Sequence, residues 1–212
     1  MKDLLKQVEM FEGHGFITGM TGSGKTYFAS QLAKRSFQRF IFVNAQFEKE
    51  VSRVCNAHVS TINNLMEALY NKRNRIEFIP HLNPEQALTQ FSELRKYLFR
   101  IGKDINAEHW ITLIVDEADI YAPKGAYSDL NSCFQRGRRY GIQCIAISQR
   151  PQLVSSTLLN QCRWQVIFLS GGYSAPYFTE YKIPYYEHLE WVSQKYHYIY
   201  FDGVSAQEYP PI

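Results

Sequence analysis

The sequence contains little cysteine, and what it has is widely spaced. Its four cysteines are Cys55, Cys133, Cys144 and Cys162, and none of them forms a CxxC pair. Because zinc sites and disulfide frameworks use clustered or numerous cysteines, we expect neither, and a reducing compartment is favoured. Cys144 lies in an apolar run, so we expect it to be a small buried residue.

Long apolar segments are also missing from the sequence. No run approaches the roughly 18 apolar residues that a transmembrane helix needs. The N-terminal stretch MKDLLKQVEMFEGHG is too charged for a signal peptide. We therefore expect a protein that is not secreted and has no membrane span of its own, so that any action at a membrane would depend on a partner.

Length and charge set broad limits on the class of protein. A chain of 212 residues without internal repeats or linkers suits one α/β domain, which we assign to residues 1–212. The formal net charge of +3 permits a nucleic-acid partner but does not require one.

Short apolar runs alternate with helical stretches along the chain. Fully apolar strands that alternate with helices are typical of a mainly parallel sheet covered on both faces. In the helix expected from Lys25, Phe28, Ala29, Leu32 and Ala33 share one face. The expected strands lie in the segments GFITG (15–19), RFIFVN (39–44), RIEFIP (75–80), WITLIVDEAD (110–119), YGIQCIAISQRP (140–151), RWQVIFLS (163–170) and YHYIYFDG (196–203).

Two segments carry more detailed signals. The alternation in RIEFIP predicts a strand with one wet face, which would carry Arg75 and Glu77. A helix is expected after Asn83, which can cap it, with Pro84 at its first position and Gln86 at the capping-box spacing.

The stretch GMTGSGKT (19–26) matches the phosphate-binding pattern G-x-x-x-x-G-K-[ST]. Glycines let backbone N–H groups turn toward phosphate oxygens, and the following helix presents its positive end. We expect Lys25 to neutralise the β and γ phosphates and the Thr26 hydroxyl to bind Mg²⁺. The predicted nucleotide contacts are Gly19, Met20, Thr21, Gly22, Ser23, Gly24, Lys25, Thr26 and Tyr27.

Two acids end the apolar strand in LIVDEAD. Asp116 stands where a Walker B acid holds Mg²⁺, here through water. Glu117 follows it directly and is placed to polarise a water molecule for attack on the γ-phosphate. This arrangement favours hydrolysis over transfer to a substrate. The alternative is a solvated acidic turn after a core strand.

Polar residues also end the strand in IQCIAISQRP. Ser148 and Gln149 should emerge at the carboxyl edge of the sheet, where ligands bind. A glutamine there can hydrogen-bond both the γ-phosphate and the attacking water, and so report hydrolysis to the following loop. The alternative is that these residues only begin a turn toward Pro151.

The segment FQRGRRYG contains three arginines after a helical pattern whose buried face is set by Leu130, Cys133, Phe134 and Gly137. In steps of about 100°, Arg139 lies opposite this face, whereas Arg136 and Arg138 flank it. Flanking arginines suit an arginine finger that reaches a neighbouring subunit's ATP. A solvated basic face is the open alternative.

Together, GMTGSGKT, LIVDEADIYAPK, RGRRYGIQCIAISQRPQLV and LLNQCRWQVIFL resemble the FtsK–HerA superfamily of DNA-pumping ATPases. The resemblance implies a RecA-like P-loop core, a homo-oligomeric ring (often a hexamer) and ATP-driven movement of double-stranded DNA. It assigns Lys25 and Thr26 to the nucleotide, Asp116 to Mg²⁺, Glu117 to the catalytic base and Gln149 to the sensor. By the same match, Arg138 corresponds to the family's GR arginine.

The short chain is similar to the genome-packaging ATPases of icosahedral viruses with an internal membrane. This similarity implies ATP and Mg²⁺ as cofactors and a capsid or membrane vertex protein as a further partner. It implies location in the host cytoplasm and at the packaging vertex of the virion. Residues 48–100 match no motif, and their cations Lys72, Arg73 and Arg75 are a candidate basic rim or an ordinary solvated turn.

Three other functions remain open at this point. A cellular HerA-like or conjugation-type translocase would belong to the same superfamily, but we expect an N-terminal β-barrel or membrane segment in it. A small-molecule kinase would use the same loop and yield a phosphorylated acceptor. An assembly protein of filamentous phage would need a membrane span.

Overall fold

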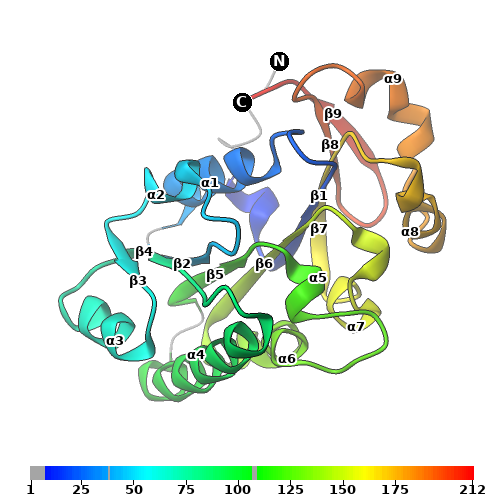
Figure 1. Cartoon of the computed structure of the whole chain (residues 1–212). Coiled ribbons are helices and arrows are strands. Elements are labelled where there is room, and N and C mark those ends of the chain that lie inside the picture. Colours follow the sequence, from blue (N-terminus) through cyan, green and yellow to red (C-terminus); the bar gives the residue numbers. More distant parts are fainter. Residues whose placement is uncertain (1–7, 38, 107–108) are drawn as a thin grey trace.

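The computed structural model describes residues 8–37, 39–106 and 109–212. Within these residues, nine strands pair into one sheet in the order β3-β4-β2-β5-β6-β1-β7-β8-β9 (Figure 1). The strands are β1 (His14–Thr18), β2 (Phe40–Val43), β3 (Ala57–Val59), β4 (Arg75–Phe78), β5 (Ile111–Val115), β6 (Ile142–Ser148), β7 (Cys162–Phe168), β8 (Tyr198–Phe201) and β9 (Ala206–Tyr209).

Helices cover both faces of the sheet, as the sequence predicted. The buried apolar residues divide into two clusters, one under α1 and α2 and the other under α3 to α8 (Figure 1). The α-helices are α1 (Lys25–Ser36), α2 (Lys49–Ser52), α3 (Ile62–Tyr70), α4 (Pro84–Ile105), α5 (Ala118–Tyr121), α6 (Asp129–Arg136), α7 (Ser156–Leu159), α8 (Ala175–Glu180) and α9 (Leu189–Val192). Short 3₁₀ helices are η2 (Val8–Phe11), η3 (Gly137–Tyr140), η4 (Pro151–Leu153), η5 (Gly172–Ser174) and η6 (Tyr185–His188).

Local sequence signals explain where the main helices begin and which side they bury. The side chain of Asn83 accepts hydrogen bonds from the backbone of Glu85 and Gln86, and Pro84 begins α4, as predicted. The face of α1 that carries Phe28, Ala29, Leu32 and Ala33 is buried, as expected from its spacing. Cys144 is fully buried in β6.

The prediction of a wet face on β4 was wrong. Glu77 is only 1% exposed. Its carboxylate accepts hydrogen bonds from Asn44 Nδ2 at 2.6 Å and from Ser52 Oγ at 2.9 Å, and it pairs with His58. The reason is that β4 lies between β3 and β2, and Ser52 of α2 covers this face. The short strands β3 and β9 lie outside the segments where the sequence predicted strands.

Strand direction determines which residues meet at each edge of the sheet. From β3 to β7 all pairs are parallel, so these strands all end at one edge, which we call the carboxyl edge, and begin at the opposite amino edge. β6 lies between β5 and β1. The ends of these three strands, and the loops that follow them, therefore meet side by side at the carboxyl edge.

None of the helices in the described ranges combines the length and the apolar character needed to cross a membrane.

Candidate nucleotide-binding site

The glycine loop joins β1 to α1 at the carboxyl edge. Gly24 caps α1 with φ of 103°, a left-handed conformation that favours glycine. A Cβ atom on Gly19 would lie 2.7 Å from both the Cβ of Phe168 and the hydroxyl of Ser23, so the loop packs too closely for any side chain there. Glycine is therefore required at Gly24 for its backbone conformation and at Gly19 for lack of space.

The loop is suited to hold an anion. A Cβ atom on Gly22 would meet no atom within 4 Å, so this part of the loop faces open space. The buried hydroxyl of Ser23 has no hydrogen-bond partner among the described residues. Lys25 is buried, and its ammonium donates to the carbonyl oxygen of Met20 at 2.9 Å. Burial lowers the pKa of Lys25, while Asp116 and Glu117 act in the opposite direction.

The two acids follow β5, as predicted. Asp116 Oδ1 accepts a hydrogen bond from the backbone N–H of Glu117 at 2.9 Å. Burial, reinforced by the Glu117 charge, raises the pKa of Asp116 to about 7. Burial also raises the pKa of Glu117, with the Asp119 charge as the next cause. Glu117 has φ of 53°, an uncommon conformation for a non-glycine residue that tends to occur at functional sites.

Gln149 connects the glycine loop to the acids. Its Oε1 accepts a hydrogen bond from Thr21 Oγ1 at 2.5 Å, and its Nε2 donates to Glu117 Oε1 at 2.7 Å. This bridge forms because β6 lies between β1 and β5 in the sheet. The three motifs that the sequence placed at strand ends are therefore in direct contact, although 128 residues separate Thr21 from Gln149.

A cavity of about 620 Å³ lies over these groups. Among the residues predicted to bind nucleotide or metal, or to act in catalysis, the cavity is lined by Thr21, Gly22, Gly24, Lys25, Thr26, Tyr27, Asp116, Glu117 and Gln149. Gly19, Met20 and Ser23 do not line it. Met20 instead contributes its backbone, which binds Lys25 and donates to the Leu169 carbonyl oxygen at 2.7 Å.

The residues present fit a magnesium–nucleotide complex. Thr26 and Asp116 line the same cavity and offer the hydroxyl and carboxylate oxygens that Mg²⁺ prefers. Lys25 lines the cavity on the side of the glycine loop, where phosphate oxygens would be received.

A second polar group beside the site was missed in the sequence. Asp119 is 8% exposed and accepts a hydrogen bond from Ser148 Oγ at 2.7 Å. It also pairs with the guanidinium of Arg150 at 3.0 Å. The Ser148 hydroxyl in turn accepts from the backbone N–H of Arg150 at 3.0 Å. Asp119 thus fixes the start of the loop after Gln149. Its place in the DEAD stretch was the available signal.

Residues from the segment without motifs also reach the cavity. Glu48 and Glu50 line it, as does Gln46 just before this segment. The side chain of Asn44 holds the backbone of Glu48 on both sides, accepting from its N–H at 2.9 Å and donating to its carbonyl oxygen at 3.1 Å. Asn44 is itself bonded to the buried Glu77. The buried carboxylate on β4 therefore helps to position a carboxylate in the cavity.

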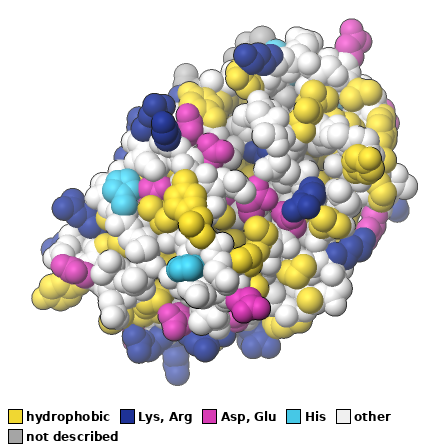
Figure 2. Space-filling view, in the orientation of Figure 1, with side chains coloured by type: hydrophobic (Ala, Val, Ile, Leu, Met, Phe, Trp, Pro, Cys, Tyr) yellow, Lys and Arg dark blue, Asp and Glu magenta, His cyan; other side chains and the backbone are white. Residues whose placement is uncertain are grey.

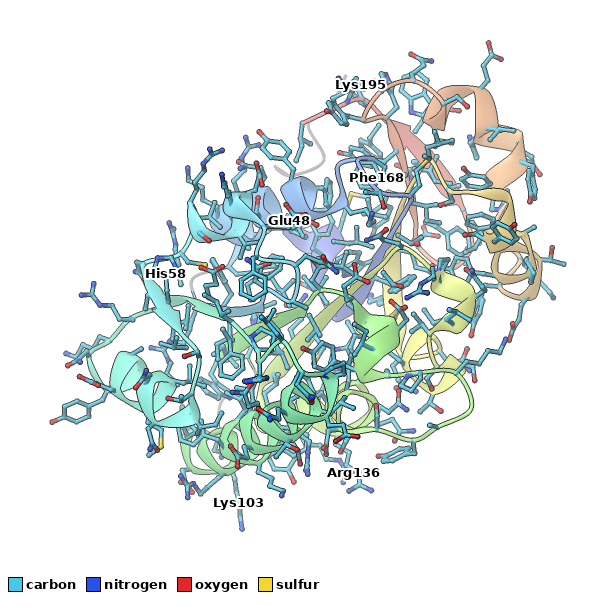
Figure 3. All side chains as sticks on the ribbon, viewed as in Figure 1. Glu48, His58, Lys103, Arg136, Phe168 and Lys195 are labelled. Carbon is cyan, nitrogen blue, oxygen red and sulfur yellow. The ribbon has the colours of Figure 1, made fainter. Side chains whose placement is uncertain are left out.

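Arg136 and Arg138 do not lie at this site. α6 ends at Arg136 and the chain continues as the 3₁₀ helix η3, so the helical angles predicted for Arg138 and Arg139 do not apply. All three arginines are exposed at the amino edge, separated from Gln149 by the seven residues of β6, a length of roughly 23 Å. Figure 3 shows Arg136 at the lower rim of the molecule, well below Glu48 and Phe168.

The other candidate cations also lie away from the cavity. Lys72 and Arg73 precede β4 at the amino edge, and Arg75 is its first residue. Figure 2 shows Lys and Arg side chains gathered along the lower rim of the view, near Lys103 and Arg136 of Figure 3.

The fold is that of P-loop NTPases, with the glycine loop between the first strand and helix of a mainly parallel sheet. The chain is similar to the genome packaging NTPase B204 from Sulfolobus turreted icosahedral virus 2 in complex with AMP, at 16% identity and a TM-score of 0.72, over 94% of this chain and 98% of that one. No protein-family model matches the sequence, and no curated protein sequence matches it significantly.

Two further solved structures share the fold. VirB4 of Thermoanaerobacter pseudethanolicus is 11% identical, with a TM-score of 0.69 over 100% of this chain and 93% of that one. EssC (ATPases 2 and 3) from Geobacillus thermodenitrificans is 16% identical, with a TM-score of 0.55 over 94% of this chain and 39% of that one. The resemblance inferred from the motifs is thus confirmed at the level of the fold.

Proposed function

We propose that the chain is a magnesium-dependent ATPase of the FtsK–HerA superfamily that moves double-stranded DNA, packaging a viral genome into a preformed capsid. The observation that carries the proposal is the bridge from Thr21 through Gln149 to Glu117. It joins a phosphate-binding loop to a carboxylate placed for hydrolysis.

Each residue of the site has a defined part in the proposed reaction. Lys25 and the loop N–H groups hold the β and γ phosphates, and Thr26 and Asp116 hold Mg²⁺, which stabilises charge on the phosphates. Glu117 orients a water molecule and takes its proton as the water oxygen attacks the γ-phosphorus; the bond to the β–γ bridging oxygen breaks, and ADP and inorganic phosphate leave. Its raised pKa suits this task because a base works best when its pKa approaches the working pH.

Gln149 is the proposed sensor, whose hydrogen bonds change when ATP is hydrolysed. Its amide is hydrogen-bonded to both Thr21 and Glu117. A γ-phosphate and an attacking water in the cavity would compete for these hydrogen bonds. Gln149 would then change partners with each turnover and pass this change to Arg150, the next residue along the chain and the partner of Asp119.

The motor part of the proposal depends on the ordered motifs and on the similarity to a packaging NTPase along nearly the whole chain. Arg136 and Arg138 lie too far from this chain's own cavity to act there, so a finger role requires the nucleotide of an adjacent subunit. A homo-oligomeric ring, with a hexamer favoured, supplies that arrangement. Double-stranded DNA and a capsid or membrane vertex protein are the proposed partners.

A conjugation-type ATPase is the second candidate. It is favoured by the similarity to VirB4, which extends over all of this chain. A small-molecule kinase is the third, and Glu117 argues against it because transfer to an acceptor has less use for a water-activating base.

The decisive variant is Glu117→Gln, which keeps the shape of the side chain and removes the base. We expect hydrolysis to fall by about 10³-fold while binding of a non-hydrolysable ATP analogue is retained. Phosphate release measures the first and calorimetry the second. The matched control is Glu93→Gln on the exposed side of α4, which should leave both unchanged.

Three results would count against the proposal. Undiminished hydrolysis in Glu117→Gln would remove the assigned base. A phosphorylated acceptor in place of free phosphate would indicate a kinase. Failure of double-stranded DNA to stimulate hydrolysis, together with no assembly in mass measurements with nucleotide, would contradict a DNA motor.

A further inference from the structure

The glycine loop has two different flanks. On one side of β1 lie β6 and β5, which bring Gln149, Asp116 and Glu117. On the other side lies β7, whose last residue is Phe168. The first flank is polar and contains the groups proposed for hydrolysis. The second flank has no part in the proposed reaction.

The antiparallel strands β8 and β9 bring two more segments to the second flank. Phe168 at the end of β7 pairs with Tyr198 at the start of β8, and Tyr198 pairs with Tyr209 at the end of β9. The residues just before β8 and just after β9 therefore reach the carboxyl edge. Tyr196, Pro211 and Ile212 accordingly line the same cavity as the glycine loop.

Tyr196 lies directly against the loop. A Cβ atom on Gly24 would be 3.3 Å from Cδ1 of Tyr196, so the ring borders the cap of α1. The ammonium of Lys195 lies 4.9 Å from the ring centroid. Tyr196 is 45% exposed and has φ of 64°, so it is kept in an uncommon conformation while its ring borders the cavity.

Phe28, Phe168 and Tyr198 line the same cavity as Tyr196 and pack against one another. The ring of Tyr198 packs edge-on against Phe28 of α1 at 5.0 Å between centroids and tilted against Phe168 at 5.2 Å. It stacks on Tyr209 with an interplanar angle of 11°. All four of these residues are buried, so a layer of packed aromatic rings supports the second flank.

We propose that this flank is the nucleobase site, with Tyr196 as the stacking platform and Pro211 and Ile212 as its apolar edge. The inference deepens the proposed function and rests on it. A nucleoside triphosphate has a charged tail and a flat aromatic base, and the cavity has a polar flank and an aromatic flank. Stacking recognises the face of a base, so the site accepts ATP and GTP alike and holds pyrimidines, which stack over a smaller area, less tightly.

The test compares ligands with and without a base. Calorimetry would measure binding of a non-hydrolysable ATP analogue and of inorganic tripolyphosphate, both with magnesium. We expect Tyr196→Ala to weaken binding of the analogue about tenfold and to leave tripolyphosphate unchanged, because only the base stacks. Tyr196→Phe keeps the ring and should bind both ligands like the unsubstituted chain. Tyr173→Ala, at a side chain that is 90% exposed and outside the cavity lining, is the matched control.

Other outcomes overturn the inference in distinguishable ways. Equal losses for both ligands in Tyr196→Ala would show that the ring only supports the loop. Unchanged analogue binding in that variant would show that the base lies elsewhere. Preference for the ATP analogue over the GTP analogue by more than about 100-fold would mean that hydrogen bonds read the base. A wild-type chain that binds neither ligand would overturn the proposed function and the platform with it.

Discussion

Charged side chains are buried near one end of strand β6 and exposed near the other. At the carboxyl end, next to Ser148 and Gln149, the charged groups Asp116, Glu117 and Asp119 are buried and bonded to neighbours. At the amino end, Arg136, Arg138 and Arg139 are exposed, and none forms an ion pair within the described part of the chain. Buried charge is costly unless its surroundings compensate it.

This difference indicates what each end contacts. At the carboxyl end, hydrogen bonds hold the buried acids in position beside this chain's own cavity, and these bonds offset the cost of burying them. The amino end keeps its cations solvated and free to meet another molecule. The predictions below test this contrast by removing one group at a time, from the largest expected effect to the smallest.

The largest effect is expected at the amino end. If Arg138 is the finger, Arg138→Ala should lower ATP hydrolysis by the assembled protein by about 10³-fold and leave nucleotide binding by the chain unchanged. Arg139→Ala is the matched control because Arg139 is equally exposed and its neighbour in η3. Phosphate release at a fixed protein concentration measures both, and Arg136→Ala tests the alternative finger.

Mixing two inactive variants separates action between subunits from action within one. A ring containing Arg138→Ala and Glu117→Gln subunits would pair some intact bases with intact arginines from neighbours. Hydrolysis above that of either variant alone is therefore expected. An assembled mixture that regains nothing would contradict the finger role.

The next effect is at the carboxyl end of the same strand. Gln149→Leu removes both hydrogen bonds of the bridge while keeping most of the side-chain volume. We expect kcat to fall by about 10²-fold with little change in KM, because Gln149 is proposed to hydrogen-bond the γ-phosphate and the attacking water in the transition state. Gln161→Leu, at an exposed position away from the cavity, is the control. A rise in KM at unchanged kcat would instead make Gln149 a binding residue.

The sequence predicted best those features that depend on local pattern or strand direction. Asp116 and Gln149 could be placed at one edge because parallel strands end together. The cap at Asn83 depends only on its neighbours. Features that depend on distant contacts were not predictable. Glu77 is buried because Asn44 and Ser52, distant in sequence, surround it.

The arginines and the aromatic flank show the same limit. The 100° steps that placed Arg138 on a helix face assumed that α6 continues, but it ends at Arg136 because Gly137 begins a 3₁₀ turn. Tyr196 and Ile212 carried no local signal, since only the antiparallel return of β8 and β9 brings them to the glycine loop.

The last prediction concerns stability and involves a buried histidine next to β6. His14, the first residue of β1, is 3% exposed, and its Nδ1 accepts a hydrogen bond from the Cys144 N–H at 2.9 Å. Burial, with Arg138 as the next cause, lowers the pKa of His14 from 6.5 to about 4. Between pH 6.5 and pH 4 His14 is therefore protonated in the unfolded chain and neutral in the folded chain. Its contribution to the free energy of unfolding is complete above pH 6.5 and is lost as the pH falls toward 4. The shift corresponds to about 3 kcal/mol of unfolding free energy.

His14→Asn should remove this contribution, because the amide oxygen can accept the Cys144 hydrogen bond and does not titrate. Urea unfolding at pH 7 and pH 4.5 would measure the difference for both chains. Arg138→Ala should reduce the loss only slightly, since burial is the larger cause. An equal loss in His14→Asn would show that other groups titrate instead.

Burial favours the neutral form at both ends of β6, raising the pKa of Asp116 and lowering that of His14. Only at the carboxyl end does the fold also supply Lys25 as a countercharge.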